Sequence, residues 1–260
     1  MDFTKDSNKM NERIKEILTE DKYGEFTPIV QKYLNRALNE YNLSPEFVDL
    51  FAKSCKTIEI GSMPKEIEWA LGLTVYAEKK IIISNKIYKI AKKEKNDNIY
   101  EYVSHILNHE IMHMLLQNIP GIGNALTEAI TEVAASRTSF GKDKGKMKEY
   151  REETYGYSYI TFGAKILAAA IGVSEKEFLQ LAFEHKIYEK VAKELHSKER
   201  ANKFLYEINK ELEIVRRATL EEKHTDEELK NIQTKAYHAI YIKRKRIFKF
   251  KNFKCRNKWK

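Results

Sequence analysis

Two histidines four residues apart, with a glutamate directly after the first, form the most distinctive chemical pattern in the chain. They are His109, Glu110 and His113, in the stretch HILNHEIMHMLLQN. On a helix, side chains four positions apart lie on one face, so the two imidazoles can bind one zinc ion. Glu110 would then lie where a general base can act on a water molecule. The alternative is that the two histidines lie on an ordinary helix and bind no metal.

A third protein ligand would favour the metal site, because a catalytic zinc ion has three protein ligands and one open position. The stretch ALTEAITEVAA places Glu128 and Glu132 four residues apart in an otherwise apolar run. A buried carboxylate is costly unless it is paired or binds a metal. If this helix folds back across the first, Glu128 completes a His-His-Glu site and Glu132 accepts a hydrogen bond from a ligand histidine. The reverse assignment, with Glu132 as the ligand, is the alternative.

The neighbouring side chains are predicted to have more ordinary roles. His105 lies one turn before His109 on the same face, but a fourth protein ligand would close the site to water. We therefore interpret His105 as an outer hydrogen-bonding or packing residue. The predicted core contacts of this helix are Met112, Met114 and Leu115, and the histidines predicted to be solvated are His185, His196, His224 and His238.

The two motifs together resemble those of the gluzincin-type zinc metallopeptidases, which include the thermolysin-like enzymes. Gluzincins carry H-E-x-x-H on one helix and an N-E-x-x-x-D-type motif on a following helix, which stand here as HEIMH and TEAITE. The resemblance covers roughly residues 70–185 and implies a peptidase that hydrolyses peptide bonds with a zinc-activated water. The implied metal ligands are His109, His113 and Glu128, with Glu110 as general base and Glu132 as outer hydrogen-bonding partner.

Some details are closer to the small bacterial gluzincins than to the thermolysin-like enzymes. The gap between His113 and Glu128 is short, although Glu132 stands where the family usually has aspartate. Small members also tend to have a tyrosine about one helix length before an Ile-Gly pair, which is the position of Tyr157 here. A phenol over the metal would stabilise an oxyanion. The alternative role of Tyr157 is packing within an aromatic cluster.

The apolar patterns predict an α+β fold, mostly helical, with one small β-sheet before the zinc-binding helix. The runs TIEIG, GLTVYAE and KIIISN are rich in β-branched residues and are predicted to be strands, the latter two paired around Glu78-Lys79-Lys80. In the family that the chain resembles, an edge strand of this sheet binds substrate. Helices are predicted over residues 8–20, 27–41, 45–54, 96–117, 124–136, 155–172 and 175–185, followed by two or three charged helices through about residue 243.

Length and composition suit a globular protein, since 260 residues with 42% hydrophobic residues can bury a sizeable core. We predict an N-terminal helical segment over residues 1–56, a catalytic core over 57–185 and C-terminal helices with a basic tail over 186–260. The sequence has no signal-peptide run and no apolar segment of transmembrane length. Its two isolated cysteines suit a reducing compartment. A cytoplasmic location is therefore predicted, with export by another route left open.

The positive charge of the chain is concentrated at its C-terminus. Ten basic residues and no acidic residue follow Tyr241, and subtracting them from the net charge of +9 leaves −1 for the rest of the chain. Residues 243–260 are predicted to be either a basic strand or tail packed on the body, or an arm. Such an arm would bind nucleic acid, an anionic surface or an acidic protein substrate.

Two functions follow from these patterns. The first is a peptidase that acts on a peptide or protein substrate. The alternative is a non-catalytic, metal-stabilised binding or regulatory protein that uses its basic tail on nucleic acid or an anionic surface.

Overall fold

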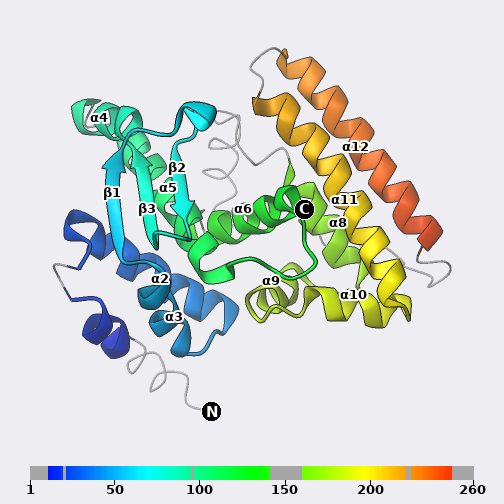
Figure 1. The fold of residues 1–260 in the computed structure, drawn as a ribbon, viewed down its shortest axis with the longest axis horizontal. Helices are drawn as coiled ribbons and strands as arrows, with labels where there is room; N and C mark the ends of the chain where they lie inside the picture. The colour runs from blue at the N-terminus through cyan, green and yellow to red at the C-terminus, as the bar shows by residue number, and fades with distance from the viewer. Residues whose placement is uncertain (1–10, 20–21, 95–96, 141–159, 221–223, 248–260) are drawn as a thin grey trace.

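The computed structural model describes residues 11–19, 22–94, 97–140, 160–220 and 224–247 (Figure 1). The chain is mostly helical with one three-stranded sheet, which confirms the predicted α+β class. Within this part of the chain, no helix combines the length and apolar composition needed to cross a membrane.

The helices of the described residues differ widely in length. Residues 11–17 are helical, and two short 3-10 turns are η1 (Gly24–Phe26) and η2 (Lys65–Ile67). The further α-helices are α2 (Thr27–Tyr41), α3 (Glu46–Ser54), α4 (Asn85–Glu94), α5 (Asp97–Leu116), α6 (Asn124–Phe140), α8 (Phe162–Ala170), α9 (Glu175–Phe183), α10 (Ile187–Leu195), α11 (Lys198–Leu220) and α12 (Asp226–Ile247).

The sheet consists of β1 (Thr57–Gly61), β2 (Gly72–Val75) and β3 (Lys80–Ser84), in the order β1-β3-β2. The three strands lie in the three predicted runs, and β2 and β3 form the predicted antiparallel pair. Strand β1 runs parallel to β3. Ile81 and Ile83 are fully buried because alternate residues of β3 face the core. The strand order leaves β2 at an edge of the sheet, and β2 packs against α5.

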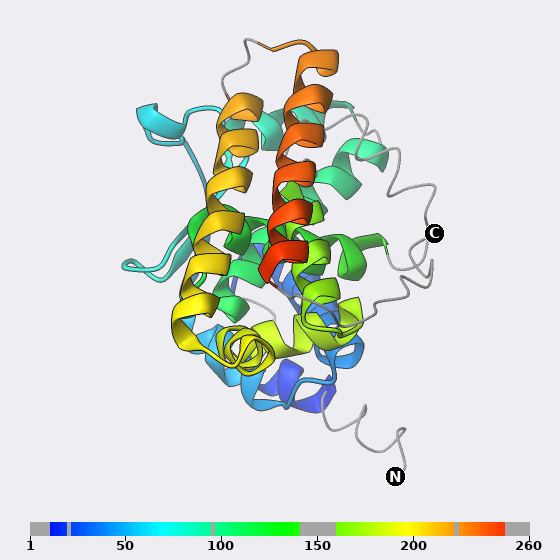
Figure 2. The ribbon, with the colours of Figure 1, turned by 90° about the vertical axis from the view of Figure 1, so that its right-hand side faces the viewer.

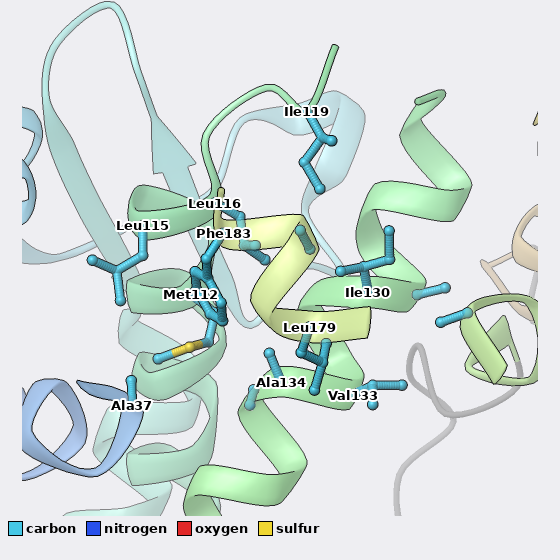
Figure 3. Close-up of a cluster of buried hydrophobic side chains, with 14 of the residues drawn as sticks. Ala37, Met112, Leu115, Leu116, Ile119, Ile130, Val133, Ala134, Leu179 and Phe183 are labelled. Atoms are coloured by element: carbon cyan, nitrogen blue, oxygen red, sulfur yellow. The ribbon is translucent and has the colours of Figure 1, made fainter. Parts of the chain in front are cut away.

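Helix α5 is the central element and is buried on all sides from residue 103 to residue 116. Helices α2, α3, α4, α6 and α9 and strands β2 and β3 all pack against it. Figure 3 shows part of this core, where Met112 and Leu115 lie near Ala37 of α2 and Phe183 of α9. The core contacts predicted for this helix are confirmed. Because α5 is enclosed, any polar side chain on it needs a partner inside the protein.

After the sheet, the chain becomes helical earlier than predicted. Helix α4 begins at Asn85, directly after β3, whereas a helix was predicted only from Asn96 onward. Ile87 and Tyr88 of α4 are partly buried and pack against the core. The prediction was wrong because it ended the strand at Ser84 and Asn85 without treating them as a helix start, although both are residue types that favour a helix N-terminus.

The region after α6 differs in extent from the prediction. Helix α6 continues to Phe140, beyond the predicted end at residue 136. Residues 141–159, which include Tyr157, lie outside the described residues. Of the helix predicted over residues 155–172, the described part begins at Phe162.

Helices α11 and α12 form a long pair on one side of the molecule (Figures 1 and 2). Helix α11 also packs against α6. Buried side chains from Ile14 to Ile240 form one continuous hydrophobic cluster. The three predicted segments therefore share a core, and their description as separate domains stays a prediction.

The described end of the basic region belongs to α12. The ammonium group of Lys243 lies 2.6 Å from a carboxylate oxygen of Glu207 and 2.8 Å from one of Glu211, both on α11. Arg244 donates a hydrogen bond to the carbonyl of Ala169. Residues 243–247 of the predicted basic strand or tail are therefore helical, while residues 248–260 lie outside the described residues.

Candidate metal centre

The turn between α5 and α6 brings the histidines and the carboxylates together. It begins at Gln117, which has a φ of 49°, and contains Gly121 with a φ of 73°. Helix α6 then packs back against α5. Helix α11 fixes the start of α6, because Asn209 Oδ1 accepts a hydrogen bond from the Leu126 N–H at 3.1 Å. Asn209 approaches so closely that a Cβ at Gly123 would lie 2.3 Å from its Cγ.

Three side-chain atoms converge at one point between these helices. The Nε2 atoms of His109 and His113 are 3.1 Å apart. Glu128 Oε2 lies 3.3 Å from His109 Nε2 and 3.1 Å from His113 Nε2. Among the residues that the structure describes, this is the one group of three histidine, cysteine or acidic side chains arranged to hold a metal ion. Both histidines are buried and the Glu128 side chain is 22% exposed, so the group meets solvent on the Glu128 side.

The spacing of these atoms suits a metal ion better than a set of hydrogen bonds. In a tetrahedral site, zinc bonds of about 2.0–2.1 Å place two ligand atoms about 3.3–3.4 Å apart. The three observed separations of 3.1, 3.1 and 3.3 Å are close to this value. Hydrogen bonds cannot satisfy all three contacts, because two ring nitrogens that both donate to Glu128 would face each other as donors. A cation between three lone pairs satisfies every contact, so the buried His-His-Glu group can hold a metal ion.

Hydrogen bonds behind the imidazole rings set which nitrogens face this point. His109 Nδ1 lies 3.0 Å from Glu132 Oε2, and His113 Nδ1 lies 3.4 Å from Thr131 Oγ1. If each Nδ1–H is donated to its partner, each Nε2 keeps a lone pair for a metal. The structure therefore places Glu128 in the group of three donor atoms and Glu132 behind the His109 ring, while their roles as ligand and outer partner stay predictions.

Glu132 links the His109 ring to further buried polar side chains behind it. Its Oε1 accepts a hydrogen bond from Ser136 Oγ at 2.7 Å and lies 3.3 Å from His105 Nε2. His105 Nδ1 lies 2.8 Å from Ser139 Oγ, and its ring stacks on Phe140. His105 thus lies behind Glu132, outside the group of three donor atoms.

The electrostatics of the group favour positive charge at its centre. Burial lowers the pKa of His109, but hydrogen bonds with Glu128 and Glu132 outweigh burial and raise it to about 10. Burial raises the pKa of both carboxylates. Nevertheless His113 and His109 hold the pKa of Glu128 well below its usual range, and His105 and His109 do the same for Glu132. A metal cation held by this group would supply the positive charge while the rings stay neutral, which is the form that binds metals.

Glu110 lies beside the group and is held by the edge strand β2. Thr74 Oγ1 donates a hydrogen bond to Glu110 Oε2 at 2.7 Å. Gly72 lies against the same carboxylate, since a Cβ there would be 2.8 Å from Glu110 Oε1. Glu110 is buried and is not one of the three donor atoms. The structure therefore holds the Glu110 carboxylate in place on the residue that follows His109, where its charge acts on the His109 ring.

Tyr76 is an aromatic side chain in contact with the backbone of His113. Its hydroxyl donates a hydrogen bond to the carbonyl of His113 at 3.1 Å, and 39% of the residue is exposed. Burial, together with the charges of Glu110 and Glu128, raises the pKa of Tyr76 above its usual value. Tyr157, predicted for a catalytic phenol, is not among the described residues.

Three contacts at the site were not predicted from the sequence. Thr74 contacts the Glu110 carboxylate, Tyr76 contacts the His113 carbonyl, and Thr131 contacts the His113 ring. Thr131 could have been found from its position between Glu128 and Glu132 on the same helix. For the other two, a signal lies in the alternation G-x-T-x-Y within GLTVYAE, which places these residues on one face of a strand.

Comparison of the chain with protein-family models, with curated proteins and with solved structures finds no match. The resemblance to gluzincins rests on the residues of the two motifs and stays a prediction.

Proposed function

We propose that the protein is a zinc-dependent peptidase with His109, His113 and Glu128 as metal ligands and Glu110 as general base. The observation that carries the proposal is Glu110, a carboxylate that directly follows His109 on α5, is held by Thr74 and is not one of the three donor atoms. A purely structural metal site does not need such a carboxylate, whereas hydrolysis needs a group that accepts and returns a proton. Three protein ligands also leave one position open, as catalytic zinc sites do.

In this mechanism Glu110 moves one proton. A bound zinc ion supplies Lewis acidity, which polarises the scissile carbonyl and lowers the pKa of the attacking water. Glu110 takes a proton from that water as the water oxygen bonds to the carbonyl carbon. The same carboxyl group then gives the proton to the amide nitrogen as the C–N bond breaks, which releases an acid and an amine. Glu132 and Thr131 keep the two imidazole rings in their orientation.

An extended peptide is the substrate that the sheet favours. Strand β2 pairs with β3 on one side and lies at the edge of the described sheet, next to Glu110. An edge strand offers its backbone N–H and C=O groups to another extended chain. A peptide paired with β2 would pass beside the general base, in keeping with the edge-strand binding that the family resemblance implies.

Glu110 also favours zinc over iron. Two histidines and one carboxylate form the ligand set of iron(II) oxygenases as well as that of zinc peptidases. The mechanism of an oxygenase does not require a general base next to the first ligand. The sequence order of a histidine ligand, a glutamate and a second histidine ligand four residues later is that of metal-assisted hydrolysis.

The test is a metal analysis combined with a cleavage screen. The purified protein is expected to contain about one zinc ion per chain by elemental analysis. It is expected to cleave members of a proteome-derived peptide library, to lose this activity on chelation and to regain it when zinc is added. Iron in place of zinc would contradict the assigned metal. A zinc-loaded protein that cleaves no peptide of the library would contradict the peptidase and leave the metal site intact.

A cytoplasmic location and the role of the basic tail stay predictions. Deletion of residues 248–260 is expected to leave zinc content and cleavage of short peptides unchanged, because α12 keeps its contacts with the body. Binding to duplex DNA or to anionic vesicles is expected to weaken, since fewer basic groups contact the anionic surface.

A longer deletion is the control for this experiment. Removal of residues 243–260 also takes away the ion pairs of Lys243 with Glu207 and Glu211, so it is expected to lower the melting temperature as well. If the shorter deletion unfolds the protein or releases its zinc, the tail is part of the fold and the prediction of an arm is wrong.

A further inference from the structure

We propose that Thr74 positions Glu110 for proton transfer, by donating its hydroxyl hydrogen to one carboxylate oxygen from the edge strand β2. This inference rests on the proposed function, because it assumes that Glu110 is the general base. Three features of β2 support it, which are the direction of its side chains, the hydrogen bond of Thr74 and the absence of a side chain at Gly72.

The first feature is that one face of β2 contacts α5 at the reacting residues. Gly72 and Thr74 are two positions apart, so they lie on the same face of the strand, and both contact Glu110. Tyr76 follows two positions later and donates a hydrogen bond to the carbonyl of the ligand residue His113. Strand β2 is in turn paired with β3 along its whole length. The sheet therefore fixes where this face lies relative to α5.

The second feature is the hydrogen bond itself. The separation of 2.7 Å between Thr74 Oγ1 and Glu110 Oε2 is within the short range typical of a hydroxyl bound to a carboxylate. Thr74 Oγ1 also lies 3.3 Å from the backbone carbonyl oxygen of Glu110. Threonine has few χ1 rotamers because it is β-branched, so it presents its donor rigidly. A carboxylate offers about four acceptor sites, so this bond leaves sites free to accept a proton.

The third feature is the close approach of the β2 backbone to Glu110. A Cβ at Gly72 would lie 2.8 Å from Glu110 Oε1 and 2.9 Å from Glu110 Cγ, closer than side-chain atoms approach one another. The strand backbone thus supports one oxygen of the carboxylate while Thr74 holds the other. Such support matters because a displacement of about 1 Å in a reacting group can cost about 100-fold in rate.

The central experiment compares Thr74→Val with Thr74→Ser. Valine keeps the shape and strand preference of threonine but has no hydroxyl, whereas serine keeps the hydroxyl. Thr74→Val is expected to retain zinc and its melting temperature, with kcat reduced about 10–100-fold and KM unchanged. Thr74→Ser is expected to recover most of kcat. Val75→Thr is the control, because it replaces valine with threonine at the next position, which faces the other side of the strand. It is expected to leave kcat unchanged.

A double-mutant cycle with Glu110→Gln tests whether Thr74 acts through Glu110. If it does, Thr74→Val lowers kcat in the wild-type background and has little further effect once Glu110 is glutamine. Additive effects of the two substitutions would show that Thr74 acts elsewhere and would overturn the proposal. Gly72→Ala displaces the same carboxylate from its other side and is expected to reduce kcat with zinc retained. Thr74→Ala, which also removes the hydroxyl, supplies the same test of Thr74 if Thr74→Val does not fold.

Crystal structures of the zinc-loaded wild type and of zinc-loaded Thr74→Val give a readout that does not depend on activity. The Glu110 carboxylate is expected to occupy one position in the wild type and to shift or split between rotamers in the variant. An unchanged carboxylate in the variant would overturn the proposal whatever the kinetics. If the wild type binds zinc but cleaves no peptide, the peptidase fails, while a displaced Glu110 in the variant still supports the positioning role of Thr74.

Discussion

Replacing Glu110 with glutamine is expected to remove nearly all peptidase activity while leaving zinc bound. Glutamine has the same size, and its amide oxygen can accept the hydrogen bond from Thr74, so the side chain is expected to stay in place. It cannot take a proton from the attacking water. Both kcat and kcat/KM are expected to fall by about 10²–10⁴-fold, because the lost interaction belongs to the transition state. The metal ligands are untouched, so zinc content should match that of the wild type.

The measurement is the initial rate of cleavage of one peptide, with zinc content and melting temperature recorded for each variant. Glu110→Asp is the matched control, since it keeps the carboxylate but withdraws it by one methylene from the metal position. Its activity is expected to lie between those of the wild type and Glu110→Gln. Near-normal turnover by Glu110→Gln would remove Glu110 from the mechanism and leave the site without a base.

That His109, His113 and Glu128 come together could be predicted from the sequence, because the geometry of this group is local. His109 and His113 are one helical turn apart, and so are Glu128 and Glu132. The two helices are joined by a short turn rich in glycine and proline, which leaves them little freedom except to pack against each other. Burial then makes unpaired carboxylates costly, so the sequence pattern and the physics of burial indicate the same site.

The surroundings of the site could not be predicted in the same way, because they depend on contacts between distant segments. Thr74 reaches Glu110 across 36 residues, and Asn209 fixes the start of α6 across 83 residues. No local periodicity links such positions. The strand pattern predicted β2, but its packing against α5 is set by the pairing of β2 with β3 and by the buried face of β3. For the same reason the sequence did not reveal that α11 supports α6.

A measurement of zinc affinity is expected to distinguish the roles of Glu128 and Glu132, the two carboxylates on α6. Glu128 Oε2 contacts the Nε2 atoms of both histidines, so Glu128→Ala leaves two ligands and is expected to lose zinc as completely as His113→Ala. Glu132 lies instead behind the His109 ring, at Nδ1, on the side away from the other donor atoms. Its replacement is expected to weaken zinc binding by about 10–100-fold, the usual effect of losing a partner that orients a ligand.

The choice of substitution at Glu132 decides whether this experiment measures metal binding or folding. The residue is 4% exposed, and Glu132→Ala would leave buried donors without an acceptor, including Ser136 Oγ. Glu132→Gln keeps the size and one acceptor oxygen, so it is the cleaner variant. Zinc at 100 times its Kd stabilises the native state by about 2.7 kcal/mol, so zinc is expected to raise the melting temperature of Glu132→Gln but not that of Glu128→Ala. The opposite result would make Glu132 the ligand and move the metal one turn along α6.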